Sequence, residues 1–439
     1  MTKHYRAWTP DQTYLLPPSP REWLPPDHLV FVVLDVVGEL DLSAIDLAYA
    51  AKDPRGTQPY DPRMMVGLLL YGYCVGVCSS RKLERATFED VAIRVLCGEQ
   101  HPDHSSIAAF RSRHREALKG LFVQILRLCQ RAGLVKLGEV SLDGTKMAAN
   151  ASKHKAMSYE RMLKREAELR SEIEALLAAA EATDQSEDER YGRGRRGDEL
   201  PAELARRESR VEKIRAAKAA LEAEAANPPA RQPEELPQHR VPREPDGRPK
   251  PKAQRNFTDP ESRIMKRGRE FVQGYNAQVA VDGANQVIVA TAVTNQSPDA
   301  EHLRPMMGRV AENAGLHPRR LSADAGYWSE SNARWLAEQG IDGYLATEKL
   351  KHNERPPSPR GRIPRSLDAK GRMRRKLRTK AVRAIYARRK TIVEPVFGQI
   401  REAQGFRRFS VRGLARVEAE WSLVCTAHNL RKLHRMGWR

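Results

Sequence analysis

Apolar positions in the first third of the chain follow a helical pattern. Between residues 43 and 132 they recur at intervals of three and four, the spacing of one buried helix face. The longest apolar run, 63–78, follows Pro62 and predicts a helix that is buried almost all round. Short helices separated by tight turns are expected around it, so residues 43–135 are predicted to form an all-helical domain. Residues 1–42, dotted with Pro and Trp, are predicted to be an irregular arm.

The pattern changes after this domain. A short β-like run at 138–142 ends at Asp143, and the chain then leaves the sheet for a long insertion. Within 159–226, apolar residues recur at heptad-like steps on both sides of a polar gap, which predicts an antiparallel helical hairpin. Residues 227–260 hold nine prolines among charged residues and predict a flexible linker.

Strand and helix patterns alternate in the last part of the chain. Two alternating runs flank the turn sequence at 282–285 and predict a β-hairpin. Helix, strand, helix and strand then follow in turn, at about 300–314, 321–324, 329–339 and 341–346. A basic stretch at 349–380 shows no periodicity and leads into a final helical region. The order predicts a mixed sheet with helices packed on it, so residues 136–158 and 261–439 are expected to form one α/β domain.

The net charge of the chain indicates the class of molecule that it binds. The 439 residues carry 76 Lys+Arg against 56 Asp+Glu, a formal net charge of +20. Such an excess favours a polyanion, and we expect double-stranded DNA; a solvated basic surface is the alternative. No apolar run approaches the ~20 residues that cross a bilayer, so no membrane partner is expected. Five cysteines without disulfide-like spacing agree with a reducing compartment, and the protein is predicted to be cytoplasmic.

Three acidic residues stand out against this basic background. Asp143 and Asp324 each end a predicted strand, and Glu394 lies on a predicted late helix. Phosphodiester chemistry needs an activated oxygen nucleophile and a stabilised leaving oxygen, and two Mg²⁺ ions ~3.5–4 Å apart can serve both. Mg²⁺ takes hard oxygen ligands, so a few carboxylates and a substrate phosphate suffice. We therefore expect the three carboxylates to converge on a metal site, although each alone is also typical of a turn, cap or surface position.

Several sequence blocks resemble the DDE transposases of bacterial insertion sequences. They lie at 142–155, 274–282, 322–327 and 393–401, and shorter blocks at 60–63 and 102–106 are similar to the N-terminal domain of that family. The resemblance implies an RNase-H-like catalytic domain in which Asp143, Asp324 and Glu394 are the catalytic ligands of two Mg²⁺ or Mn²⁺ ions. It also implies strand cleavage and strand transfer at terminal inverted repeats and in target DNA, by a homodimer assembled on DNA in the nucleoid.

The family often shows a Tyr, Arg, Glu, Lys signature around its Glu, and this chain departs from it. Counted from Glu394, the Tyr position holds Ala387, with Tyr386 one residue early, and the Arg position holds Lys390. The Lys position holds Arg401. Lys390, Glu394 and Arg401 are spaced to share one helix face, so the two cations are expected to contact DNA phosphates. The alternative is a pair of solvated cations that flank an acid.

Two further groups of cations are predicted to bind DNA. Arg111 and Arg113 lie in the helical domain, which is either a helix-turn-helix-like module or a bundle with a basic surface. The stretch 349–380 is expected to pass near the site as a disordered segment, and it contributes Arg372, Arg374, Arg375 and Lys376.

Two other functions fit the same sequence. An RNase-H-like nuclease would cut DNA without joining it, and a DNA-binding protein would carry the acidic trio in an inactive form. Mg²⁺-dependent cleavage separates the enzymes from the binding protein. Joining of a pre-cut end to a target plasmid separates the transposase from the nuclease.

Overall fold

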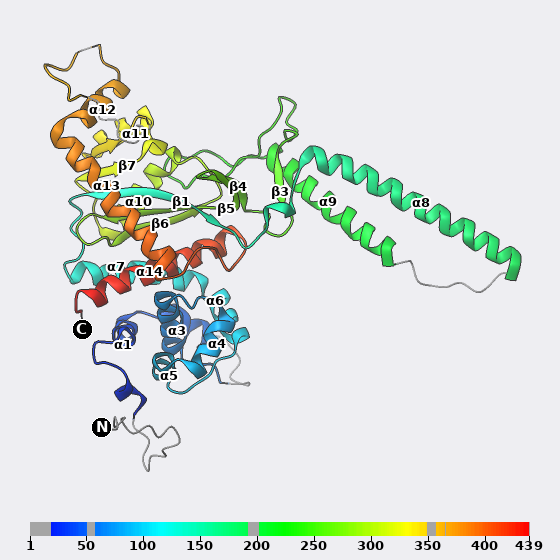
Figure 1. Cartoon of the computed structure of the whole chain (residues 1–439), viewed down its shortest axis with the longest axis horizontal. Coiled ribbons are helices and arrows are strands. Elements are labelled where there is room, and N and C mark those ends of the chain that lie inside the picture. Colours follow the sequence, from blue (N-terminus) through cyan, green and yellow to red (C-terminus); the bar gives the residue numbers. More distant parts are fainter. Residues whose placement is uncertain (1–18, 51–57, 192–201, 349–356, 365, 439) are drawn as a thin grey trace, which may run out of the picture.

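The computed structural model describes residues 19–50, 58–191, 202–348, 357–364 and 366–438. The described part begins with a group of short helices (Figure 1). They are η1 (Pro20–Trp23), α1 (Leu29–Glu39), α2 (Ser43–Ala50), α3 (Pro62–Val75), α4 (Ser80–Glu89), α5 (Val91–Cys97), α6 (His104–Arg113) and α7 (Arg115–Arg131). These helices form the all-helical N-terminal domain.

The buried helix at the centre of this domain is α3. It begins with Pro62 after the capping residue Asp61, whose carboxylate accepts the backbone N–H of Arg63 at 2.6 Å. It ends at Gly76, which takes the left-handed conformation that glycine adopts without strain. Within the described residues, no single helix is long and apolar enough to cross a membrane; α3 and α4 pass such a test only as a pair bent by 95°.

Helix α1 lies within the stretch 1–42 that was expected to be irregular. Its buried residues include Val30, Val33 and Val36, and the helix packs against α3. Valine has a weak intrinsic preference for the helix, so the local sequence gives little signal there. Burial of the valines against α3 stabilises the helix despite its low intrinsic propensity.

A mixed six-stranded sheet forms the centre of the second domain. Its strands are β1 (Val140–Ala148), β4 (Arg263–Arg267), β5 (Glu270–Asp282), β6 (Ile288–Thr294), β7 (Arg320–Ala323) and β8 (Asp342–Leu345). The central strand β1 runs antiparallel to β5 and parallel to β7, and β8 continues the parallel part beside β7. Both β4 and β6 pair antiparallel with β5.

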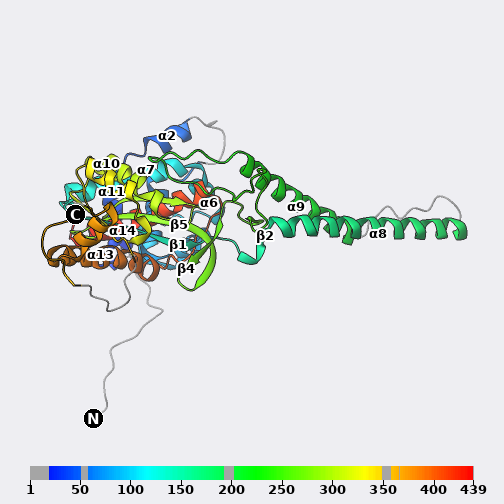
Figure 2. The same ribbon diagram turned by 90° about the horizontal axis from the view of Figure 1, so that it is seen from above.

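Helices cover both faces of this sheet. They are η3 (Ala300–His302), α10 (Leu303–Ala314), η4 (Ala325–Tyr327), α11 (Glu330–Glu338), α12 (Ala369–Arg378), α13 (Lys380–Gly398), the π-helical turn η5 (Gln399–Ala403) and α14 (Leu414–Arg435). Helices α10 and α11 lie on one side of the sheet and α13 on the other (Figure 2). The predicted fold class is confirmed: an RNase-H-like mixed α/β domain with a helical insertion, preceded by a helical domain.

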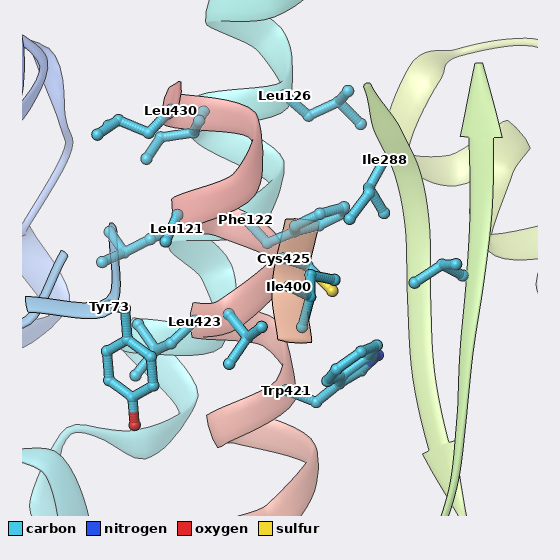
Figure 3. Close-up of a cluster of buried hydrophobic side chains, with 14 of the residues drawn as sticks. Tyr73, Leu121, Phe122, Leu126, Ile288, Ile400, Trp421, Leu423, Cys425 and Leu430 are labelled. Carbon is cyan, nitrogen blue, oxygen red and sulfur yellow. The ribbon is translucent and has the colours of Figure 1, made fainter. Parts of the chain in front are cut away.

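One apolar core runs through both domains. Helix α14 contacts α3 and α7 of the helical domain and β6 of the sheet. Figure 3 shows Phe122 of α7, Trp421 and Cys425 of α14 and Ile288 of β6 in this cluster. The indole N–H of Trp421 also donates to the backbone oxygen of Gln278 on β5 at 3.2 Å. The helical domain is therefore fixed to the sheet through α7 and α14.

Two long helices, α8 (Tyr159–Tyr191) and α9 (Ala202–Ala226), project from the sheet domain as a hairpin (Figure 1). They occupy the range for which the hairpin is predicted. At its base, β2 (Ala156–Ser158) and β3 (Gln254–Asn256) form a small antiparallel sheet. Between the helices Glu166 is only 7 % exposed, and it accepts hydrogen bonds from three cations, Arg170, Arg215 and Lys218.

Residues 227–260, predicted as a flexible linker, differ from that expectation because they pack against the rest of the chain. Val241 and Ala253 are buried in the apolar cluster of the hairpin. The backbone N–H of His239 donates to Asn295 Oδ1 at 2.8 Å. Proline prevents helices and central strands but does not prevent burial, so composition alone overstates the flexibility of such a segment.

The basic stretch 349–380 also differs from the expectation in its described part, because α12 spans Ala369–Arg378. Its capping residue Asp368 accepts the backbone N–H of Gly371 at 2.7 Å. No residue of α12 is buried, so the helix has no apolar stripe by which its sequence could have revealed it.

Candidate active site

The sheet places Asp143 and Asp324 side by side. Strands β1 and β7 are parallel with Leu142 opposite Ala323, so the two aspartates occupy the next register position on neighbouring strands, which lie about 4.8 Å apart. Local hydrogen bonds hold each carboxylate. Asp143 accepts the backbone N–H of Gly144 at 2.8 Å, and Asp324 accepts that of Gly326 at 2.8 Å.

Asp143 is largely buried beside one arginine. Its side chain is 20 % exposed, and the guanidinium of Arg389, itself 12 % exposed, lies 3.1 Å from Oδ2. Burial raises the pKa of Asp143 to about 6; Arg389 opposes the rise, and the carboxylate of Asp324 adds to it. A nearby cation favours the charged form of such a carboxyl, so this site is electrostatically suited to bind one.

A buried polar network supports the site from the other face of the sheet. In the β1–β5 register, Gln278 and Asn276 stand opposite Gly144 and Lys146. Both side-chain amides donate to Asp299, at 2.9 and 2.8 Å, and Lys146 Nζ lies 3.0 Å from the same carboxylate. The block at 274–282 therefore contributes the polar support of the strand that carries Asp143.

Gly144 is required by this packing. A Cβ at residue 144 would lie 2.2 Å from Gln278 Nε2 and 3.1 Å from Asn276 Oδ1. The network extends to the segment that carries Asp324, because the hydroxyl of Tyr327 donates to Gln278 Oε1. The two sequence blocks that supply the aspartates are thus joined through the side chain of Gln278.

Helix α13 reaches the aspartates with Tyr386 and Arg389. The hydroxyl of Tyr386 donates to the backbone oxygen of Ala323 at 3.3 Å, next to Asp324, and Arg389 pairs with Asp143. Ala387 and Lys390, which occupy the positions counted back from Glu394, are both exposed. Tyr386 and Arg389 keep the three-residue spacing of the Tyr and Arg in the family signature. Each lies one residue before the position counted back from Glu394. Arg389 is not among the residues predicted from the sequence, and the early Tyr386 was the signal that could have revealed it.

Glu394 lies on the exposed flank of α13. The residues of this helix that pack inward nearby are Val393 and Val396. In the part of the chain that the structure describes, no three His, Cys, Asp or Glu side chains form a group that could hold a metal ion. The structure therefore brings together two of the three predicted ligands, and the role of Glu394 stays a prediction.

The cations predicted to flank Glu394 have different surroundings. Arg401 lies over the strand of Asp143, because its guanidinium donates to the hydroxyl of Thr145, two residues further along β1. Lys390 is exposed. Arg401 is therefore within reach of a ligand bound beside Asp143, whereas Lys390 faces solvent.

The predicted cations of the helical domain also differ from one another. Arg111 points inward and donates to the hydroxyl of Tyr73 and the backbone oxygen of Cys78, each at 3.2 Å. Arg113 is exposed and lines a cavity of about 550 Å³. Arg111 therefore has structural partners that already use its donors, and Arg113 faces an accessible space.

The four cations of α12 are tied to the edge of the sheet domain. Arg374 pairs with Glu348 at 3.0 Å, and Lys376 pairs with Asp342. The remaining two donate to backbone carbonyls: Arg372 to Leu367 at 2.9 Å, and Arg375 to Gly361 at 2.6 Å. These contacts fix the position of α12, where an unstructured segment was expected.

The donor chemistry of the aspartate pair fits a hard divalent cation. Two carboxylates on adjacent strand ends supply the oxygen ligands that Mg²⁺ and Mn²⁺ prefer. Burial and the second carboxylate both disfavour the charged form of Asp143, and a bound cation would offset both effects. The pair is thus a candidate metal site.

Comparison with protein families matches two separate parts of the chain. A model described as a transposase DDE domain matches residues 239–430, and one described as a transposase domain (DUF772) matches residues 18–113. The first range contains Asp324, Arg389 and Glu394, whereas Asp143 precedes it, on the other side of the helical hairpin. The second range covers the helices from η1 to α6. No curated protein and no solved structure matches the chain.

Proposed function

Because the chain belongs to the DDE-type transposases of insertion sequences, we propose that it cleaves DNA at the ends of its element and joins the cut ends to target DNA. The observation that carries this proposal is the pairing of two carboxylates, Asp143 and Asp324, on adjacent parallel strands beneath a cationic helix. Transposases act on DNA, and the net charge of +20 agrees with that partner.

Asp143 and Asp324 would hold the divalent cations that transposases of this type generally use. Such ions, when bound, activate the attacking oxygen and stabilise the leaving oxygen of the phosphodiester. Glu394 completes the ligand set in this proposal, because it lies on the same helix as Arg389, five residues further on, at the exposed edge that DNA would approach.

Each remaining residue of the site has a role that follows from its contacts. Arg389 keeps Asp143 ionised before cations bind, and Gln278 fixes the strand that carries Asp143 relative to Tyr327. Arg401 lies two residues along the same strand from Asp143, where a guanidinium can bind a phosphate of the DNA backbone. We also propose that two copies act together, because an element has two ends.

The test uses a plasmid that carries the inverted repeats found in the DNA flanking this gene. Wild type should cleave at the repeat ends in Mg²⁺ or Mn²⁺. Asp143→Asn and Asp324→Asn should bind the same DNA as wild type does and should not cleave it. Glu338→Gln, on the exposed end of α11, is the matched control and should cleave normally. Cleavage by both aspartate variants would refute the assignment, and binding without cleavage by wild type would favour an inactive DNA-binding protein.

A further inference from the structure

The β4–β5 hairpin carries a concentrated positive charge and an exposed aromatic ring. Gly268, with φ +62°, and Arg269 form its two-residue turn, after which Glu270 pairs with Arg267 and Phe271 with Lys266. All the residues from 266 to 271 are exposed. In the described part of the chain, Lys266, Arg267 and Arg269 make no ion pair with any carboxylate.

The β4–β5 hairpin is connected to the candidate active site through Arg401. Val279 stands opposite Asp143, and Phe271 lies eight residues, or roughly 27 Å, away along β5. Arg401 donates to Thr145, which is two residues, or roughly 7 Å, from Asp143 along β1. The charge of Arg267 reaches Arg401: burial, and after it the nearby Arg267, lowers the pKa of Arg401. The cations of Arg267 and Arg401 therefore stand close together, and a bound phosphate would relieve their repulsion.

Phe271 is the second, independent observation. Its side chain is 57 % exposed, although a phenylalanine on a strand usually packs against its own sheet. It stands directly opposite Lys266 on the neighbouring strand. Proteins hold unpaired nucleotides with an exposed aromatic ring and nearby cations: the cations bind phosphates, and the ring stacks on a base.

We propose that the β4–β5 hairpin binds the unpaired end of a DNA strand that extends from the aspartate pair past Arg401, with Phe271 stacked on a base and Arg267, Arg269 and Arg401 bound to its phosphates. The inference rests on the proposed function, because it supplies a reason for a strand end to be present there. It goes further by naming a single-stranded segment as the ligand of this surface.

A second copy of the chain is the other occupant that an exposed aromatic ring could have. Lys266 stands opposite Phe271, and Arg267 and Arg269 lie in the same hairpin, so the equivalent surface of a second copy would carry the same charge. Like charges across such an interface are unfavourable. A polyanion fits this surface better than a second copy does.

The test compares two fluorescein-labelled duplexes without divalent cations, one fully paired and one with a short single-stranded overhang. Phe271→Ala should weaken binding of the overhang duplex about 5- to 100-fold, the equivalent of ~1–3 kcal/mol per stacked base, and should change binding of the paired duplex less than about twofold. Phe271→Trp should restore overhang binding. The matched control is Leu316→Ala, since Leu316 is also 57 % exposed, and it should change neither affinity.

A second experiment tests the cations of the hairpin. Arg267→Gln with Arg269→Gln should weaken both duplexes and lower the slope of log affinity against log salt by roughly one for each lost phosphate contact. Arg334→Gln, an exposed arginine on α11, is the control.

Three outcomes would overturn the inference. Phe271→Ala could bind the overhang duplex as tightly as wild type does, or it could lose equal affinity for both duplexes. Light scattering could also show that Phe271→Ala differs from wild type in oligomeric state, which would favour a second copy as the occupant. Because these measurements need no cleavage, they can fail while the carboxylate variants still behave as the proposed function requires. Conversely, the overhang preference can hold even if Asp143→Asn cleaves DNA.

Discussion

Replacing Asp143 by Asn tests whether the active site is built around a carboxylate whose charge the fold disfavours. Burial raises the pKa of Asp143 to about 6 from its ordinary value of 3.8. Between these two pH values the folded protein retains a proton that the unfolded chain has released, so the stability of the wild type falls as pH rises. The gap of about 2.2 pH units (6 − 3.8) corresponds to about 3 kcal/mol at ~1.36 kcal/mol per unit.

The Asp143→Asn variant keeps the size of the side chain and lacks this proton equilibrium. Below about pH 4 Asp143 is protonated in the folded wild type, so both side chains are neutral and the two proteins should have similar stability. Above about pH 6 its free energy of unfolding should have risen by about 3 kcal/mol relative to wild type. The sign is opposite to that of a carboxylate stabilised by an ion pair, whose removal would cost stability at high pH.

Urea unfolding between pH 4 and 7.5, in buffer free of divalent cations, measures this difference. Glu338→Gln, an exposed carboxylate on α11, should follow the wild-type profile throughout. Mg²⁺ added at pH 7.5 should stabilise wild type more than Asp143→Asn, because binding to the folded state alone raises stability. Parallel pH profiles for wild type and Asp143→Asn would refute the reasoning, since they would mean that the fold does not oppose the charge of Asp143.

Three more predictions concern the packing around Asp143, the helical hairpin and the cations of α12. Gly144→Ala should lower the free energy of unfolding by ~1–3 kcal/mol in urea titrations, because its Cβ would clash with a buried amide, whereas Gly308→Ala, with open space around it, should not. Glu166→Ala should leave three cations of the hairpin without their shared partner and speed hydrogen exchange in α8 and α9, while Glu168→Ala, 42 % exposed, should have little effect. Neutralising the α12 cations together should weaken DNA binding across all sequences and lower the salt slope by roughly one per lost phosphate contact, and an unchanged slope would mean that α12 does not contact DNA; the variant changes Arg372, Arg374, Arg375 and Lys376.

The sequence predicted the aspartate pair because both residues follow short apolar runs, and such runs become neighbouring strands in a mixed sheet. It predicted the helical hairpin region for a similar reason, since the heptad spacing within 159–226 is strong. Local patterns of this kind carry information about which element forms. They carry much less about what that element later contacts.

The features that the sequence did not reveal depend on contacts between distant segments. Helix α1 forms because α3 covers its valines, and α12 is fixed by ion pairs with β8 and Glu348. Neither contact leaves a periodic pattern in the local sequence. Arg389 was missed for another reason: positions were counted back from Glu394, whereas the structure keeps the spacing between Tyr386 and Arg389.

The joining reaction tests the central claim most directly. A labelled, pre-cut duplex that ends in the element's terminal repeat is incubated with a supercoiled target plasmid and Mg²⁺, and label attached to the plasmid is measured. The account predicts that wild type joins the end to the plasmid and that Asp143→Asn and Asp324→Asn bind the duplex without joining it. Joining by either aspartate variant at the wild-type rate would contradict the account, and wild-type cleavage without any joining would make the protein a nuclease.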